Sequence, residues 1–232
     1  MYDSKWLYLA LVLVAGLMVF NQLQINEING YFATSPGRSS ISLNLFSGSD
    51  DLKNVDVTTI QSTPQAVKML FPLDGVKTAD DVMAIMFPTG TPEYGKEMGV
   101  SFDEPVKSLE LMANAYPSLK NEVKTKHPDI WKRYLALAAA PRGISCEYCC
   151  GVGPQGISAE GESLCGCSHA PAVQTVTLWL MLNRPDYSDA EILREVMRWK
   201  TMFFPKNMIE LGMQVSGKDI GDLELPGMVG GC

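Results

Sequence analysis

The stretch APAVQTVTLWLMLNRPDYSDAEILREVMRWKTMFF, Ala170–Phe204, predicts two successive helices. Its first part is an almost uninterrupted apolar run, which the segment NRPDY at 183–187 ends. Its second part opens with Ser188 and Glu191 in the spacing of a capping box. Apolar residues then recur at helical spacing and form one face, made of Ile192, Val196, Trp199 and Phe203. This part of the chain therefore predicts a core built from helices.

Helix start signals recur through the rest of residues 63–216. Thr63 and Thr78 are predicted N-cap residues, the first followed by a proline and the second by aspartates in the first turn. Pro117 and Pro128 are each expected to open a further helical segment, and Pro205 to separate the helix ending at Phe204 from a last short one. The predicted fold class is mainly α.

The N-terminal residues have the composition of a membrane segment. The run WLYLALVLVAGLMVF, Trp6–Phe20, holds no charge, and a helix continued to Ile25 would cover roughly 30 Å. No small-residue cleavage pattern follows Phe20, so we expect an uncleaved anchor; a cleaved signal peptide and a buried helix are the alternatives. Lys5 precedes the run and the next basic residue is Arg38, which favours a single-pass protein with an extracytoplasmic domain.

These signals divide the chain into four parts. Residues 1–28 are the predicted transmembrane anchor. Residues 29–62 are a predicted linker, rich in Ser, Gly, Asn and Asp, with room for one or two short strands. Residues 63–216 form the predicted helical domain, which contains a Cys-rich turn at 146–169. Residues 217–232 are expected to form a flexible tail.

The Cys-rich turn reads CEYCCGVGPQGISAEGESLCGCSH and holds five of the six cysteines. Two thiolates separated by one or two residues can occupy two corners of a tetrahedron around one metal ion. The glycines between the two groups of cysteines allow the turn to fold back and bring both groups together. We therefore expect a metal site. Its first-choice ligands are Cys146, Cys149, Cys165 and Cys167, with Cys150 and His169 as substitutes.

Zinc is the expected metal, because a closed site of four thiolates is usually structural. An iron–sulfur cluster is the alternative, and copper(I) is the third candidate. Two other uses of the thiols stay open, namely a redox-active dithiol and structural disulfides. Cys165 and Cys167 precede a predicted helix, whose positive end lowers the pKa of a thiol, and this suits metal and redox chemistry alike.

The CGC at 165–167, followed by an apolar helix and by YSDAEILREVMRWKTMF at 187–203, supports a family resemblance. This segment is similar to the cysteine-bearing helical hairpin of cytochrome c maturation proteins of the thiol-reducing, haem-ligation type. It also resembles small secreted proteins with a P-C-Y-C-G-C motif, and CCG at 149–151 resembles a motif of iron–sulfur subunits of heterodisulfide reductases. The first resemblance implies, as an alternative function, an extracytoplasmic thiol–disulfide oxidoreductase or a haem or cytochrome maturation factor. Cys149, Cys150 and the glycine-rich loop depart from its pattern.

Net charge and motif content bear on two further classes, nucleic-acid-binding proteins and enzymes. A formal net charge of −7 without a local cluster of Lys and Arg argues against a nucleic-acid partner. No carboxylate pair, glycine-rich phosphate loop or Ser-His-Asp arrangement is recognisable, so the sequence leaves open whether the chain is an enzyme. The expected partners are the membrane, through the N-terminal helix, and another protein. Cys232 ends the chain behind two glycines and either joins the cluster or remains a separate thiol.

Overall fold

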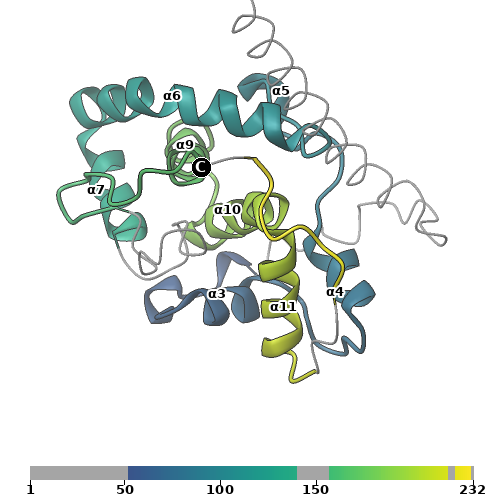
Figure 1. Cartoon of the computed structure of the whole chain (residues 1–232). Helices are drawn as coiled ribbons and strands as arrows, with labels where there is room; N and C mark the ends of the chain where they lie inside the picture. Colours follow the sequence, from purple (N-terminus) through teal and green to yellow (C-terminus); the bar gives the residue numbers. More distant parts are fainter. Residues whose placement is uncertain (1–51, 140–156, 219–222, 231–232) are drawn as a thin grey trace, which may run out of the picture. The chain divides into compact units, whose positions relative to one another are not determined.

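The computed structural model describes residues 52–139, 157–218 and 223–230, which all belong to the compact unit Gly48–Cys232. Within these residues the chain forms helices and one isolated antiparallel bridge, and no strand (Figure 1). The predicted mainly α class is therefore confirmed. In chain order the helices are η2 (Val57–Thr59), α3 (Thr63–Leu70), α4 (Ala79–Met86), α5 (Gly95–Met98), α6 (Pro105–Lys126), α7 (Pro128–Ala138), α9 (His169–Asn183), α10 (Asp189–Phe203) and α11 (Pro205–Val215).

Helix α9 lies at the centre of this unit. It packs against α6, α7 and α10, and Figure 1 shows it between α6 and α10. Every residue from Ala172 to Leu178 is buried, because the apolar run has no polar face to turn toward water. The hydroxyl of Thr175 donates to the backbone oxygen of Met112 at 2.8 Å, so this polar group finds a partner on α6 inside the core.

Helix α10 buries the apolar face that its spacing predicts, since Ile192, Val196, Trp199 and Phe203 have no exposed surface. Its predicted capping box is present: the backbone N–H of Ser188 donates to Glu191 at 2.7 Å, and the N–H of Glu191 donates to the Ser188 hydroxyl at 3.2 Å. Helix α10 packs against α9, α3 and α11, and α11 in turn packs against α3 and α4. Helix α9 thus contacts α6 and α7, and α10 contacts α3 and α11. Because α9 and α10 also pack on each other, they connect these two groups of helices.

Two predicted helix boundaries are wrong. The N-cap residue of α3 is Ser62, whose side chain accepts from the backbone N–H of Gln65, and Thr63 is already the first helical residue. Pro117 lies inside α6, which continues without a break from Pro105 to Lys126. A proline in a helix interior removes one backbone hydrogen bond and crowds the preceding turn. Pro117 is exposed, however, while α6 buries residues on both sides of it, namely Leu109, Met112, Tyr116 and Val123. Packing of this face therefore outweighs the local preference of the proline.

Segments outside the long helices also contribute to the unit. Leu52, Val57 and Ile60, from the predicted linker, are buried. Residues 223–230, from the predicted tail, are hydrogen-bonded to the ends of α10 and α11. Across the three described ranges, the helices are too short or too polar to cross a membrane. The predicted anchor, residues 1–28, lies outside the described residues.

Candidate functional site

Cys165 and Cys167 lie directly before α9, and the structure brings their side chains together. Their Sγ atoms are 3.3 Å apart, and each residue is 7% exposed. A disulfide would require an S–S distance of about 2.05 Å, so the two residues form a dithiol in this structure. The spacing predicted this closeness, because residues two positions apart in an extended chain place their side chains on the same side.

A short turn, residues 157–163, delivers the chain to Cys165. Ile157 and Ser163 form an antiparallel bridge, and the backbone N–H of Ser158 donates to the oxygen of Glu162 at 2.8 Å. Ile157 is fully buried. The hydroxyl of Ser163 donates to the backbone oxygen of Cys165 at 2.9 Å. We call residues 157–163 the anchoring turn.

Gly161 fixes the anchoring turn on α7. Its φ of +87° lies in the left-handed region, and a Cβ at this position would lie 2.3 Å from the ring of Trp131. Any other residue would therefore be disfavoured by backbone strain and by a steric clash. Glu162 adds an ion pair of 3.1 Å to Lys120, but the Glu162 side chain is largely exposed, and such pairs contribute little. The fit of Gly161 thus holds the anchoring turn against α7, four residues before Cys165.

Helix α9 begins at His169, with Ser168 as its N-cap residue. The Ser168 side chain makes no capping hydrogen bond, and the following Pro171 has no N–H to donate. Cys167 lies beside the N-terminal end of this helix of 15 residues. No side chain caps that end, and the positive end of the helix dipole favours negative charge there. This placement suits a thiolate in either a metal site or a redox dithiol.

His169 is fully buried at the same helix start. Its Nε2 atom lies 2.8 Å from the backbone oxygen of Val229, and because a carbonyl only accepts, Nε2 carries the proton. Nδ1 has no hydrogen-bond partner among the residues that the structure describes. The ring also packs against Phe203 and Phe204, with centroid distances of 5.3 and 4.7 Å. His169 therefore links the start of α9 to the corner between α10 and α11.

The predicted ligand set is brought together in part. Cys165 and Cys167 meet, whereas His169 does not join them, since no three His, Cys, Asp or Glu side chains of the described ranges are grouped to hold a metal ion. Cys146, Cys149 and Cys150 lie outside the described residues, as does Cys232. The described part of the candidate site is thus one close pair of thiols.

Sequence reasoning missed the C-terminal segment as a neighbour of this site. Val229 is buried, and its carbonyl accepts the hydrogen bond of His169, which lies 60 positions earlier. Spacing cannot predict a contact over that distance. Gly230, next to Val229, adopts a φ of +79°, which favours glycine, but a glycine alone does not indicate the contact with His169.

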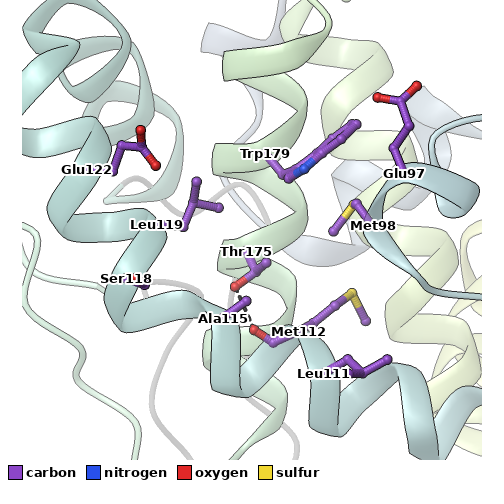
Figure 2. A pocket seen from close by; sticks show the side chains of 10 residues that line it. All are labelled: Glu97, Met98, Leu111, Met112, Ala115, Ser118, Leu119, Glu122, Thr175 and Trp179. Carbon is purple, nitrogen blue, oxygen red and sulfur yellow. Dashed lines mark hydrogen bonds between the residues drawn. The ribbon is translucent and has the colours of Figure 1, made fainter.

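An open groove lies between α5, α6 and α9 and has a volume of about 330 Å³ (Figure 2). Figure 2 shows Trp179 close to Glu97 and Met98, with Glu122 farther along α6. Glu97 already accepts a hydrogen bond of 2.7 Å from Arg184. The lining holds no cysteine or histidine, so this groove is separate from the thiol pair.

A buried polar network connects α10 to the residue before α5. The hydroxyl of Tyr94 donates to Glu195 and accepts from the indole N–H of Trp199, both at 2.9 Å. The other oxygen of Glu195 accepts from Arg198 at 2.7 Å. Burial, and then the charge of Glu195, raise the pKa of Tyr94 well above its usual value. Because these groups satisfy one another, we assign the network a structural role.

Comparisons with models of protein families, with characterised proteins and with solved structures find no match for this chain. The likeness of residues 165–203 to cytochrome maturation hairpins thus remains a resemblance of a short segment. A function for the chain has to come from its own residues.

Proposed function

We propose that the chain is a membrane-anchored metal-binding protein in which Cys165 and Cys167 form one chelating pair of a Cys-rich site. The observation that carries this proposal is the distance of 3.3 Å between the two Sγ atoms. The site would have a structural or metal-handling role.

The sulfur–sulfur distance favours chelation over disulfide formation. A zinc–sulfur distance of about 2.3 Å and a tetrahedral angle separate two thiolates by about 3.8 Å. From 3.3 Å, the pair has to open by about 0.5 Å to chelate the metal. To form a disulfide it has to close by more than about 1 Å. Chelation therefore requires the smaller rearrangement.

Burial supports the same choice. Each cysteine of the pair is only 7% exposed. A dithiol that exchanges disulfides with a partner must present a sulfur atom to that partner. A structural metal site can instead be closed to solvent, because its ligands come from the protein itself. The buried pair thus fits a closed site better than an exchanging one.

The remaining ligands are proposed from sequence spacing. Cys146 and Cys149 are the first choices, and Cys150 is a substitute. His169 is the weaker substitute, because its ring is held by Val229 and two phenylalanines and does not group with the thiols. Zinc is the first candidate metal, an iron–sulfur cluster the second and copper(I) the third.

The membrane part of the proposal rests on the sequence of residues 1–28. The uncharged run Trp6–Phe20 supports a single-pass anchor, and Lys5 before it supports an extracytoplasmic domain. Another protein is the proposed partner there.

Metal analysis of the full-length protein tests the proposal. We expect protein purified anaerobically in detergent to hold about one zinc ion per chain and to show no visible absorption. Charge-transfer bands would assign an iron–sulfur cluster instead. Cys165→Ser and Cys167→Ser should each lose most of the metal. Ser168→Ala is the matched control and should retain it, because the Ser168 side chain makes no capping bond.

A metal-free protein whose Cys165 and Cys167 are rapidly alkylated would contradict the proposal. It would favour the alternative, a thiol–disulfide oxidoreductase or a haem or cytochrome maturation factor. In that reaction Cys165 and Cys167 would be oxidised to a disulfide while a disulfide of the partner is reduced to two thiols. The closeness of the two thiols at the start of α9 is the observation that keeps this alternative in place.

A further inference from the structure

We infer that residues 223–230 form a clasp that positions Cys165 and Cys167 through His169, so that docking of the clasp and metal binding stabilise each other. The inference rests on the proposed metal-binding function and names a means of regulating that site. We call residues 223–230 the C-terminal clasp.

Hydrogen bonds at Pro226 and Val229 dock the clasp. The backbone N–H of Lys206 donates to the oxygen of Pro226 at 3.1 Å, and the N–H of Val229 donates to the oxygen of Phe203 at 2.8 Å. Nε2 of His169 donates to the oxygen of Val229 at 2.8 Å. The clasp thus connects the corner between α10 and α11 with the first residue of α9.

His169 transmits the position of the clasp to the thiols. It lies two residues after Cys167 and is fully buried. Its ring is held by the Val229 carbonyl and by contacts with Phe203 and Phe204. Because His169 is the first residue of α9 and follows Cys167 by two positions, we expect a loss of that bond to alter the path of the backbone from Cys167 into α9.

Docking of the clasp depends on a glycine at position 230. Gly230 has a φ of +79°, and a Cβ there would lie 2.5 Å from Cδ2 of Leu109 and 3.7 Å from Nε2 of His169. Leu109 is buried in α6, so it has little room to move. A side chain at position 230 should therefore push the clasp away from His169.

Docking of the clasp and metal binding affect each other equally, because thermodynamic linkage is reciprocal. A metal ion that binds more tightly when the clasp is docked must favour docking by the same factor. Groups that orient the ligands of a metal site typically contribute about 10–100-fold to its affinity. On this inference, the Val229 carbonyl and His169 act as positioning groups for the two thiols through the backbone of residues 167–169.

Glycine variants of the full-length protein test the inference. Gly230→Ala should lower zinc affinity by about 10–100-fold, measured by competition with a chelator. Gly227→Ala is the matched control in the same segment, because Gly227 is exposed and a Cβ there meets nothing within 4 Å. Its zinc affinity should stay within about twofold of the natural protein.

A second control separates positioning from general destabilisation. Gly212 lies in α11, where a Cβ would lie 2.5 Å from Cγ1 of Val82 in α4. Gly212→Ala should therefore destabilise the fold through a contact that includes neither the clasp nor His169, and it should leave zinc affinity within about twofold. An equal loss of affinity in Gly212→Ala and Gly230→Ala would overturn the inference.

Hydrogen exchange supplies the reciprocal readout. Zinc should slow amide exchange in residues 223–230 of the natural protein and should have little effect there in Gly230→Ala. Exchange that zinc leaves unchanged in the natural protein would overturn the inference. Cys232 lies outside residues 223–230, so Cys232→Ser should keep its zinc affinity. A loss as large as that of Gly230→Ala would make the terminal thiol a ligand and would also overturn the inference.

Alkylation of metal-free protein distinguishes failure of the clasp from failure of the metal proposal. Without metal, Cys165 and Cys167 should react faster in Gly230→Ala than in Gly227→Ala or Gly212→Ala, because the start of α9 is no longer held. This result would support the clasp even if the natural protein bound no metal. Equal rates in all three variants would overturn it.

Discussion

Several tyrosines of the described core are buried, some of them beside an acidic group. Burial, and then the charge of Glu195, raise the pKa of Tyr94 well above its usual value. Burial has the same effect on the pKa of Tyr134. At Tyr187, loss of hydration and then the charge of Glu195 raise the pKa to about 12. Each side chain is thereby held in its neutral form while the chain is folded.

At the residue scale we expect a loss of stability in alkaline solution. An unfolded tyrosine ionises near about pH 10, whereas folded Tyr187 ionises at about 12. The stabilisation is therefore fully present below about pH 10 and is lost as the pH rises through about 12. Tyr187→Phe cannot ionise and should show a shallower decline of the unfolding free energy, measured with urea from about pH 8 upward.

The slope with pH is the informative quantity in this comparison, because the substitution also removes a hydroxyl and can change stability at every pH. Equal slopes for Tyr187→Phe and the natural protein would show that Tyr187 does not contribute to the alkaline transition. Tyr94 and Tyr134 would then account for it.

At the scale of elements, local signals predicted helix starts where the partners are few residues apart. Thr78 accepts from the backbone of Asp81, and Ser188 and Glu191 form the predicted capping box. Pro117 is the counterexample, because the buried face of α6 on both sides of it outweighs its local effect. Helix starts that carry a local cap are thus predictable from a few residues, whereas packing decides whether a proline interrupts a helix.

The candidate site likewise has one contact that the sequence predicts and one that it does not. The closeness of Cys165 and Cys167 follows from their spacing, since a single glycine separates them. The bond between His169 and Val229 joins residues 60 positions apart. Nothing in either neighbourhood indicates that contact, because it depends on how α9, α10 and α11 meet.

Pro117→Ala tests how far packing outweighs propensity in α6. Alanine restores the missing backbone donor and relieves the crowded turn, so the unfolding free energy should rise by about 1–3 kcal/mol. Ser118→Ala, at the next exposed position, is the control and should change it by less than about 0.5 kcal/mol. Urea unfolding measures both. A loss of stability in Pro117→Ala would show that the packing of α6 on α9 needs the proline.

At the scale of the whole molecule, the chain is acidic, with a net charge of −7. It would therefore be repelled by anionic lipid, and the proposed attachment to a membrane would have to come from apolar residues. Trp6–Phe20 is the segment with that composition. Among the described residues, no helix has both the length and the apolar composition to cross a membrane.

Arginine substitutions in the full-length chain test the anchor. Val14→Arg places a charge at the middle of the predicted span, at a cost of about 2.5–3.5 kcal/mol. It should move protein from the membrane fraction to the soluble fraction. Gln24→Arg is the control, because residue 24 is expected at the headgroup level, where a charge costs little. Natural protein that leaves the membrane without detergent would contradict the anchor.

The contact between Gly161 and Trp131 gives the molecule an optical reporter. The indole of Trp131 lies directly against the anchoring turn, whereas that of Trp199 is enclosed in the core. Emission from Trp131 should therefore shift in wavelength when the anchoring turn leaves α7, while emission from Trp199 stays constant. Events at the cysteines that displace this turn can then be timed by stopped-flow fluorescence without attaching a dye.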